Sequence, residues 1–167
     1  MARPIEDLAR FAATTRWGDV PADVQRQTRL VVLDTLGVIL GGSERPEVQA
    51  LSRQLQATAG SGASVLARGW PVQDPRTAAL LNGIAGRAIE LCEGLRLASG
   101  QAAVQVLPGA LAVGEHACAA GAEFLAAFLV GYEVAGRLST ALTPRPLAHQ
   151  NGQASMLGAV APAMTLL

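Results

Sequence analysis

The segment LVVLDTLGVILGG, residues 30–42, is apolar at almost every position, and only Asp34-Thr35 interrupts it. A helix that is apolar nearly all round is usually buried on more than one side. We therefore expect a central helix that begins at Pro21, with Asp19 as its candidate cap, and ends at Gly41-Gly42. Because an unpaired buried charge is costly, we expect Asp34 to be a hydrogen-bonded structural acid.

The rest of the chain carries further helical patterns separated by Gly and Pro. Pro4 suits the first position of a helix, and Asp74-Pro75 suits an N-cap followed by such a position, opening a helix toward Glu90. Residues 63–67 fit a strand or an extended link, and residues 91–101 fit a loop. The other predicted helices cover residues 46–60, 103–118, 122–142 and 153–167. The predicted fold class is all-α, with one compact multi-helix domain over residues 1–167 and at most one short strand.

The composition limits the kinds of partner that the chain can have. Hydrophobic residues make up 50% of the chain, charged residues 16%, and the formal net charge is zero. Without a basic or acidic bias, we expect neither nucleic acid nor a membrane as partner. A neutral, apolar-rich monomer would be poorly soluble, so we expect an oligomer, either a homodimer or a complex with a partner chain.

The charged residues and the cysteines limit the chemistry. All 13 basic side chains are arginines, so no lysine of this chain can form a Schiff base. Cys92 and Cys118 lack the spacing of a metal site, and we expect free thiols and no metal. The sequence shows no signal-peptide pattern and no membrane-spanning apolar run, so we expect a cytoplasmic protein.

Several segments together resemble the N-terminal helical region of the MmgE/PrpD family, which includes 2-methylcitrate dehydratase, cis-aconitate decarboxylase and an iminodisuccinate epimerase. Their order and spacing extend over nearly the whole chain. The segments are LVVLDTLGVILGG (30–42), AALLNGIAGRAIELCEG (78–94), VLPGALAVGE (106–115), GYEVAGRL (131–138) and AHQNG (148–152). The resemblance implies this region's helical fold, with the family's second domain absent, and lyase or isomerase chemistry on small carboxylic acids without a cofactor.

The resemblance also implies where an active site would lie. His149 matches a family histidine, and Glu90 keeps a family carboxylate. Glu93 is what remains of an acidic pair whose first position is Cys92 here. At two positions where the family usually has histidine, this chain has other residues, namely Arg87 and Gln101. The family's catalytic lysines belong to its second domain.

Removing a proton next to a carboxylate needs a positioned acid and base, together with cations or donors for the carboxylate. We predict His149, Glu90 and Glu93 as the acid–base groups. The predicted substrate-binding residues are mostly hydrogen-bond donors; they are Arg87, Arg96, Gln101, Asn82 and Cys92.

Several of these residues also have an alternative interpretation as purely structural residues. His149 could be a solvated loop histidine, and Cys92 is better explained as a small buried residue. Glu90 and Glu93 would share a face if the helix reached that far. The structural alternative is a carboxylate at the helix end that pairs with Arg87 or Arg96. We favour this alternative for Glu93 and not for Glu90.

Three residues outside the predicted site also have structural interpretations. We expect Tyr132 and Glu133 to fix helix packing, with Glu133 paired to Arg137. His116 lies in a predicted helix outside any matching motif, and we expect it to be structural.

Two functions follow from this pattern. The first is an enzyme that dehydrates, isomerises or cyclises an organic acid or natural-product intermediate in an apolar pocket, using acid–base groups and no cofactor. The substituted histidines and the aliphatic composition favour a substrate larger and more apolar than a tricarboxylate. The second is a non-catalytic subunit, or one half of a split enzyme whose partner chain supplies the missing domain.

Overall fold

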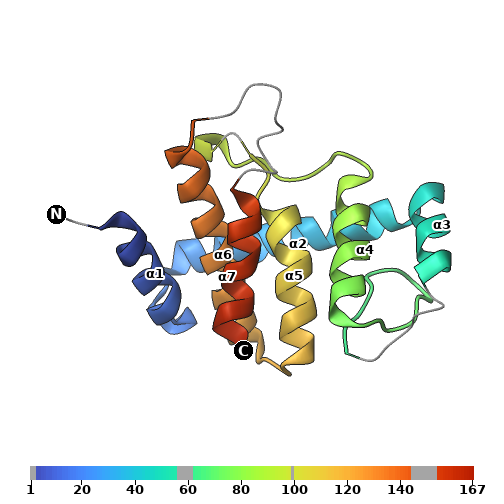
Figure 1. Ribbon diagram of the computed structural model, residues 1–167, viewed down its shortest axis with the longest axis horizontal. Coiled ribbons are helices and arrows are strands. Elements are labelled where there is room, and N and C mark those ends of the chain that lie inside the picture. The colour runs from blue at the N-terminus through green and yellow to red at the C-terminus, as the bar shows by residue number, and fades with distance from the viewer. Residues whose placement is uncertain (1–2, 56–61, 99, 144–153) are drawn as a thin grey trace.

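The computed structural model describes residues 3–55, 62–98, 100–143 and 154–167. Within these ranges it contains seven α-helices and two short 3-10 helices (Figure 1). The elements are α1 (Pro4–Thr14), η1 (Trp17–Asp19), α2 (Ala22–Ser43), α3 (Pro46–Leu55), α4 (Pro75–Arg87), η3 (Arg96–Ala98), α5 (Ala103–His116), α6 (Gly121–Ala141) and α7 (Ser155–Leu166). The prediction of an all-α domain is confirmed. Ala63 makes only an isolated bridge with Gln73, so the segment at 63–67 is an extended link.

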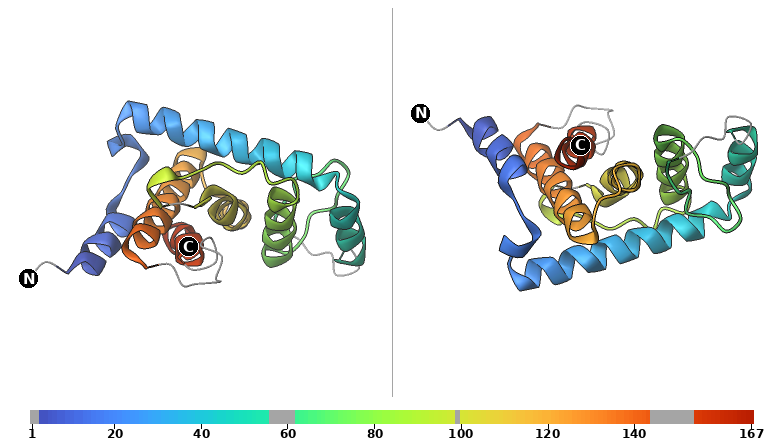
Figure 2. Two further views of the ribbon diagram at one scale, coloured as in Figure 1. Left: turned by 90° about the horizontal axis from the view of Figure 1, so that it is seen from above. Right: turned by 90° about the horizontal axis from the view of Figure 1, so that it is seen from below.

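Four helices, α4 to α7, form an upright group in which each runs antiparallel to the one before it in the chain (Figure 1). Helix α2 crosses one side of this group, roughly perpendicular to it (Figure 2). Helix α3 lies beside α4 near one end of α2, and α1 lies beside α6 near the other. This up-and-down order brings the end of α4 and the start of α5 to the same end of the group.

The ends of the helices test the predicted caps. The Asp74 carboxylate accepts hydrogen bonds from the backbone N–H groups of Arg76 and Thr77, at 3.0 and 3.3 Å, so the predicted cap of α4 is confirmed. The prediction of Asp19 as the cap of α2 is wrong, because Asp19 lies in η1 and Pro21 is the N-cap residue, without a side-chain bond. Helix α4 stops at Arg87 rather than reaching Glu90, whose φ of 53° is left-handed.

Helix α2 buries only one side within this chain. Val32, Thr35 and Ile39 face the core, whereas Leu33 is 66% exposed and Leu40 is 49% exposed. The expectation that residues 30–42 are buried on more than one side is therefore wrong for the single chain. Asp34 lies on the exposed side, so the expectation of a buried structural acid is also wrong.

Glycines allow two pairs of helices to approach each other closely. An added Cβ at Gly42 of α2 would lie 1.8 Å from the carbonyl oxygen of Ala85 in α4. One at Gly131 of α6 would lie 2.6 Å from the carbonyl oxygen of Gly158 in α7. Ala and Gly at these contacts let the backbones touch, which explains a core with few aromatic residues.

Helix α7 carries no charged residue and exposes one apolar side. The exposed side chains on it are Met156, Leu157, Val160, Met164 and, just after the helix, Leu167. Most of the opposite side packs on α5 and α6. None of the helices within the described ranges is long and apolar enough to cross a lipid bilayer.

Candidate functional site

The predicted site residues lie mainly where α4 ends and α5 begins. The chain leaves α4 at Arg87, passes through residues 88–102, and enters α5 at Ala103. The middle of α6 contributes Tyr132, which packs against this part of the core. The side chains gathered here, which we call the α4–α5 cluster, are Arg87, Glu90, Cys92, Glu93, Gln101 and Tyr132.

Arg87 is the central cation of the α4–α5 cluster. Its Nη2 atom donates to both carboxylate oxygens of Glu90, at 2.7 and 2.8 Å. Its Nη1 atom donates to Oε1 of Gln101 and to Sγ of Cys92, at 3.4 Å in the latter case. The two ends of the guanidinium therefore bind different partners, an exposed acid at Nη2 and half-buried groups at Nη1.

Glu93 lies deeper than Glu90. Its Oε1 atom accepts a hydrogen bond from the backbone N–H of Ala103 at 2.9 Å. Its Oε2 atom is buried and has no hydrogen-bond partner of ordinary geometry among the described residues. Burial raises the pKa of Glu93; the Ala103 N–H and the Tyr132 hydroxyl lower it, and the charge of Asp34 raises it. Because burial dominates, the carboxyl holds its proton at higher pH than an ordinary glutamate does.

Tyr132 is a member of the α4–α5 cluster that sequence reasoning assigned to packing alone. Its ring lies 6.0 Å from the ring of Phe128, so the packing role is present. Its hydroxyl also interacts with the Glu93 carboxylate, and burial together with that acid raises the pKa of Tyr132 far above the usual range. No local sequence pattern signals this role, because Tyr132 and Glu93 meet only through the packing of α6.

Cys92 is half-buried and is not an activated nucleophile. Its thiol donates to the carbonyl oxygen of Gly86 at 3.2 Å. Burial raises the pKa of the Cys92 thiol, and the Arg87 guanidinium only partly offsets this effect. The thiol is therefore mostly protonated at neutral pH, and its role is to hydrogen-bond Arg87 and the Gly86 carbonyl.

The two glutamates have the opposite environments from those we expected. They do not share a helix face, because α4 ends before either of them. Glu90 is the exposed carboxylate paired with Arg87, whereas Glu93 is the half-buried one. The left-handed backbone at Glu90 turns the chain after α4, and this turn separates the two side chains.

Other predicted residues lie outside the α4–α5 cluster. Asn82 is buried and holds the link at 64–66, since its side chain donates to the Ser64 carbonyl at 3.0 Å and accepts from the Leu66 N–H at 2.8 Å. Arg96 is exposed in η3. His149 lies outside the described residues, so its catalytic role stays a prediction.

The remaining sequence predictions concern residues away from the cluster. Glu133 and Arg137 form the expected ion pair at 3.0 Å. His116 is exposed at the last residue of α5. In the ranges that the structure describes, no three or more His, Cys, Asp or Glu side chains gather as a metal site would require.

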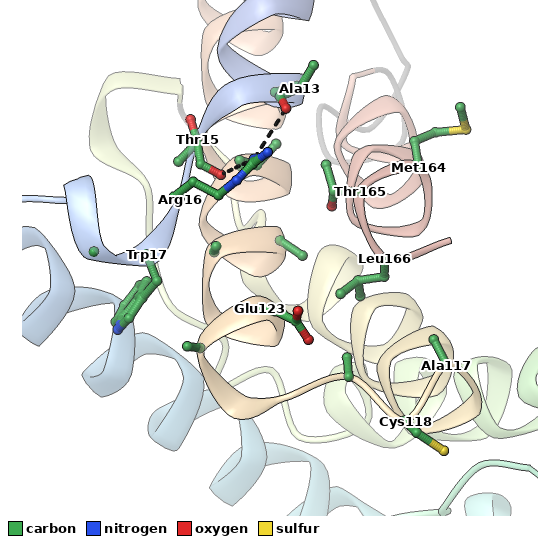
Figure 3. A pocket seen from close by; sticks show the side chains of 17 residues that line it. Ala13, Thr15, Arg16, Trp17, Ala117, Cys118, Glu123, Met164, Thr165 and Leu166 are labelled. Carbon is green, nitrogen blue, oxygen red and sulfur yellow. Dashed lines mark hydrogen bonds between the residues drawn. The ribbon is translucent and has the colours of Figure 1, made fainter.

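A separate cleft of about 820 Å³ opens at the other end of the helical group, between α1, α6 and α7. Figure 3 shows Arg16, Glu123 and Thr165 on its walls. Helix α5 starts in the α4–α5 cluster and ends near this cleft, and its 14 residues span about 20 Å. None of the predicted site residues within the described ranges lines the cleft, and its Arg16 guanidinium already donates to the carbonyls of Ala13 and Thr15.

The fold and the α4–α5 cluster define an all-helical domain in which a half-buried carboxylic acid and an arginine lie where α4 ends and α5 begins. A family model, the MmgE/PrpD N-terminal domain, matches residues 6–167. The chain therefore belongs to the MmgE/PrpD family, through its N-terminal domain. No curated protein and no solved structure matches the chain significantly.

Proposed function

We propose that this domain takes part in proton transfer on an organic carboxylic acid, in a lyase or isomerase reaction, at the α4–α5 cluster. The observation that carries the proposal is the buried Oε2 atom of Glu93, a carboxylate with a raised pKa, which has no hydrogen-bond partner of ordinary geometry among the described residues. A buried carboxyl group whose pKa is raised is a candidate acid–base catalyst. Membership of the family supports the reaction class.

Each side chain of the cluster has a role in this proposal. The ionised Glu93 carboxylate takes the proton from the carbon next to the substrate carboxylate, and Arg87 stabilises the negative charge that then develops on the substrate oxygens. In an isomerisation, Glu93 returns the same proton to another carbon. In a dehydration, the leaving hydroxide takes a second proton and departs as water, and His149 is the candidate donor.

The surroundings of the cluster favour a substrate with an apolar portion. Leu91 and Leu97 lie in the same connection between α4 and α5 and are 67% and 87% exposed. The cluster itself offers a single arginine, Arg87. We therefore propose a carboxylate attached to a larger apolar body, such as a natural-product intermediate, rather than a compact tricarboxylate.

The test is exchange of carbon-bound protons for deuterium, followed by NMR for a panel of organic acids that includes cis-aconitate and branched, more apolar acids. We expect exchange with the unmodified chain, and at least a 100-fold loss in Glu93→Gln, in line with the usual contribution of an acid–base group. Glu47→Gln is the matched control, because Glu47 is an exposed acid paired with Arg45. Equal exchange in Glu93→Gln and Glu47→Gln would remove Glu93 from the reaction.

The second candidate function is a subunit that a partner chain completes, and the exposed side of α7 favours it. A helix without charged residues is normally covered on all sides, yet Met164 is 76% exposed and Val160 is 53% exposed. Covering this side with another chain would remove a contiguous apolar surface from water. The partner would be either a second copy or a chain that supplies the family's second domain.

Light scattering of the purified chain over a range of concentrations distinguishes these partners. A second copy predicts a dimer that Val160→Glu dissociates, whereas Leu97→Glu, an exposed change outside α7, leaves the mass unchanged. A monomer at all concentrations excludes the second copy. The chain would then need a different partner before the exchange assay shows activity.

A further inference from the structure

We propose that the Glu90 carboxylate occupies the place on Arg87 where a substrate carboxylate binds, and that the substrate displaces it. This inference rests on the proposed function and deepens it, because it names the ligand class of Arg87 and the group that competes for it. Glu90 then serves as an internal carboxylate that keeps the guanidinium oriented while the site is empty. It is a specificity residue rather than an acid–base group.

The contacts of Arg87 divide the guanidinium into a fixed part and an exchangeable part. Gln101 and Cys92 hold Nη1, and both of these side chains are half-buried. Both oxygens of Glu90 contact Nη2, at 2.7 and 2.8 Å. A ligand carboxylate that replaced Glu90 would find a donor already oriented by Gln101 and Cys92, so less ordering would be needed on binding.

The difference in exposure shows which partner can leave. The side chain of Arg87 is 31% exposed, whereas that of Glu90 is 66% exposed. An exposed carboxylate regains its hydration when it swings away, so breaking its ion pair costs little. Gln101 and Cys92 need not move when a ligand carboxylate replaces Glu90 on Arg87.

The backbone at Glu90 supports a role for its side chain. Its φ of 53° lies in the left-handed region, at a turn where the Glu90 N–H donates to the Arg87 carbonyl at 3.3 Å. Glycine adopts this conformation at helix ends without steric cost. A glutamate here forms the same turn with strain and places a carboxylate on the guanidinium three residues earlier.

The substrate class that follows is an organic carboxylate whose remaining atoms extend from Arg87 toward Glu93. Cys92, whose Sγ atom accepts from the same guanidinium, directly precedes Glu93 in the chain, so the anion site and the half-buried acid belong to the same connection between α4 and α5. Neutral amides of the same shape lack the charge that competes with Glu90. Charge, rather than shape alone, is therefore the property that the Arg87 position selects.

The experiment measures binding without turnover, using butyrate as probe and butyramide as its neutral counterpart, by NMR of the arginine guanidinium signals. If Glu90 occupies Arg87 for about nine-tenths of the time, removing its charge tightens apparent butyrate binding about tenfold. We expect this gain in Glu90→Gln and in Glu90→Gly, and the second variant also relieves the backbone strain. Butyramide should not bind more tightly to the Glu90 variants than to the unmodified chain, and Arg87→Gln should not bind butyrate.

The controls separate this inference from the proposed function. Glu47→Gln removes an exposed, arginine-paired acid elsewhere and should leave butyrate binding unchanged. Unchanged butyrate affinity in both folded Glu90 variants, with binding still lost in Arg87→Gln, would overturn the competition by Glu90 and leave Arg87 as the anion site. Failure of the proposed function would be seen separately, as normal proton exchange in Glu93→Gln.

Discussion

The Glu93 carboxylate accepts a hydrogen bond from the backbone N–H of Ala103, so a loop acid binds the first residue of α5. The first N–H groups of a helix have no partner within the helix, and a carboxylate beside them also interacts favourably with the helix dipole. The same side chain is half-buried beside Tyr132. Glu93 thus combines a structural contact with an unusual protonation equilibrium.

The first prediction concerns stability and pH. Since the pKa of Glu93 is raised in the folded protein, its stabilising contribution is complete below the ordinary glutamate pKa. That contribution is lost as pH rises through the raised value. Glu93→Gln keeps an acceptor for the Ala103 N–H without titrating, so we expect it to gain stability relative to the unmodified chain as pH rises. Urea unfolding at a series of pH values measures this, and a constant difference would contradict it.

The second prediction uses two substitutions with opposite effects on the pKa of Glu93. Tyr132→Phe removes a hydroxyl that lowers this pKa, so the pKa should rise further. Asp34→Asn removes a negative charge that raises it, so the pKa should fall. Carboxyl-carbon NMR of labelled glutamate follows both changes, and shifts in the same direction would show that the two contacts are misassigned.

The third prediction concerns the N-cap of α4. Asp74→Ala removes the acceptor for two backbone N–H groups and should lower the Tm by about 3 °C. Asp19→Ala is the matched control, because Asp19 precedes α2 without capping it. Thermal unfolding followed by circular dichroism compares them, and equal effects would argue against the assigned cap.

The fourth prediction concerns the contact between α6 and α7. The added methyl group in Gly131→Ala would lie 2.6 Å from the Gly158 carbonyl oxygen, and the overpacking should cost about 1–3 kcal/mol. Gly37→Ala, at an exposed position of α2 with nothing within 4 Å, should instead stabilise the fold by about 0.5–1 kcal/mol. Chemical unfolding tests whether the free energy of unfolding falls in Gly131→Ala and rises in Gly37→Ala.

Local sequence patterns predicted the elements whose boundaries have local causes. Asp74-Pro75 specifies the start of α4 through contacts within three residues, and that prediction is confirmed. The end of α4 was missed because a non-glycine residue, Glu90, adopts the left-handed conformation there. No local pattern indicates that a glutamate will adopt a conformation that usually requires glycine.

The candidate site was only partly predictable, because its contacts join distant segments. The family resemblance led to Arg87 and Gln101, and the structure brings them into contact. The environments of Glu90 and Glu93 depend on how residues 88–102 turn between two helices, and periodicity does not encode this turn. The approach of Tyr132 to Glu93 spans 39 positions of the chain and arises from packing α6 against that turn.

The close approach of Gly42 to the carbonyl oxygen of Ala85 has a consequence for Arg87, two residues further along α4. Because no side chain separates the two backbones, this contact sets the distance between the last turn of α4 and helix α2. Arg87 extends from that turn, so a methyl group added at position 42 would displace the guanidinium without touching it. Variation at this glycine would therefore alter the hydrogen bonds of the α4–α5 cluster from a distance.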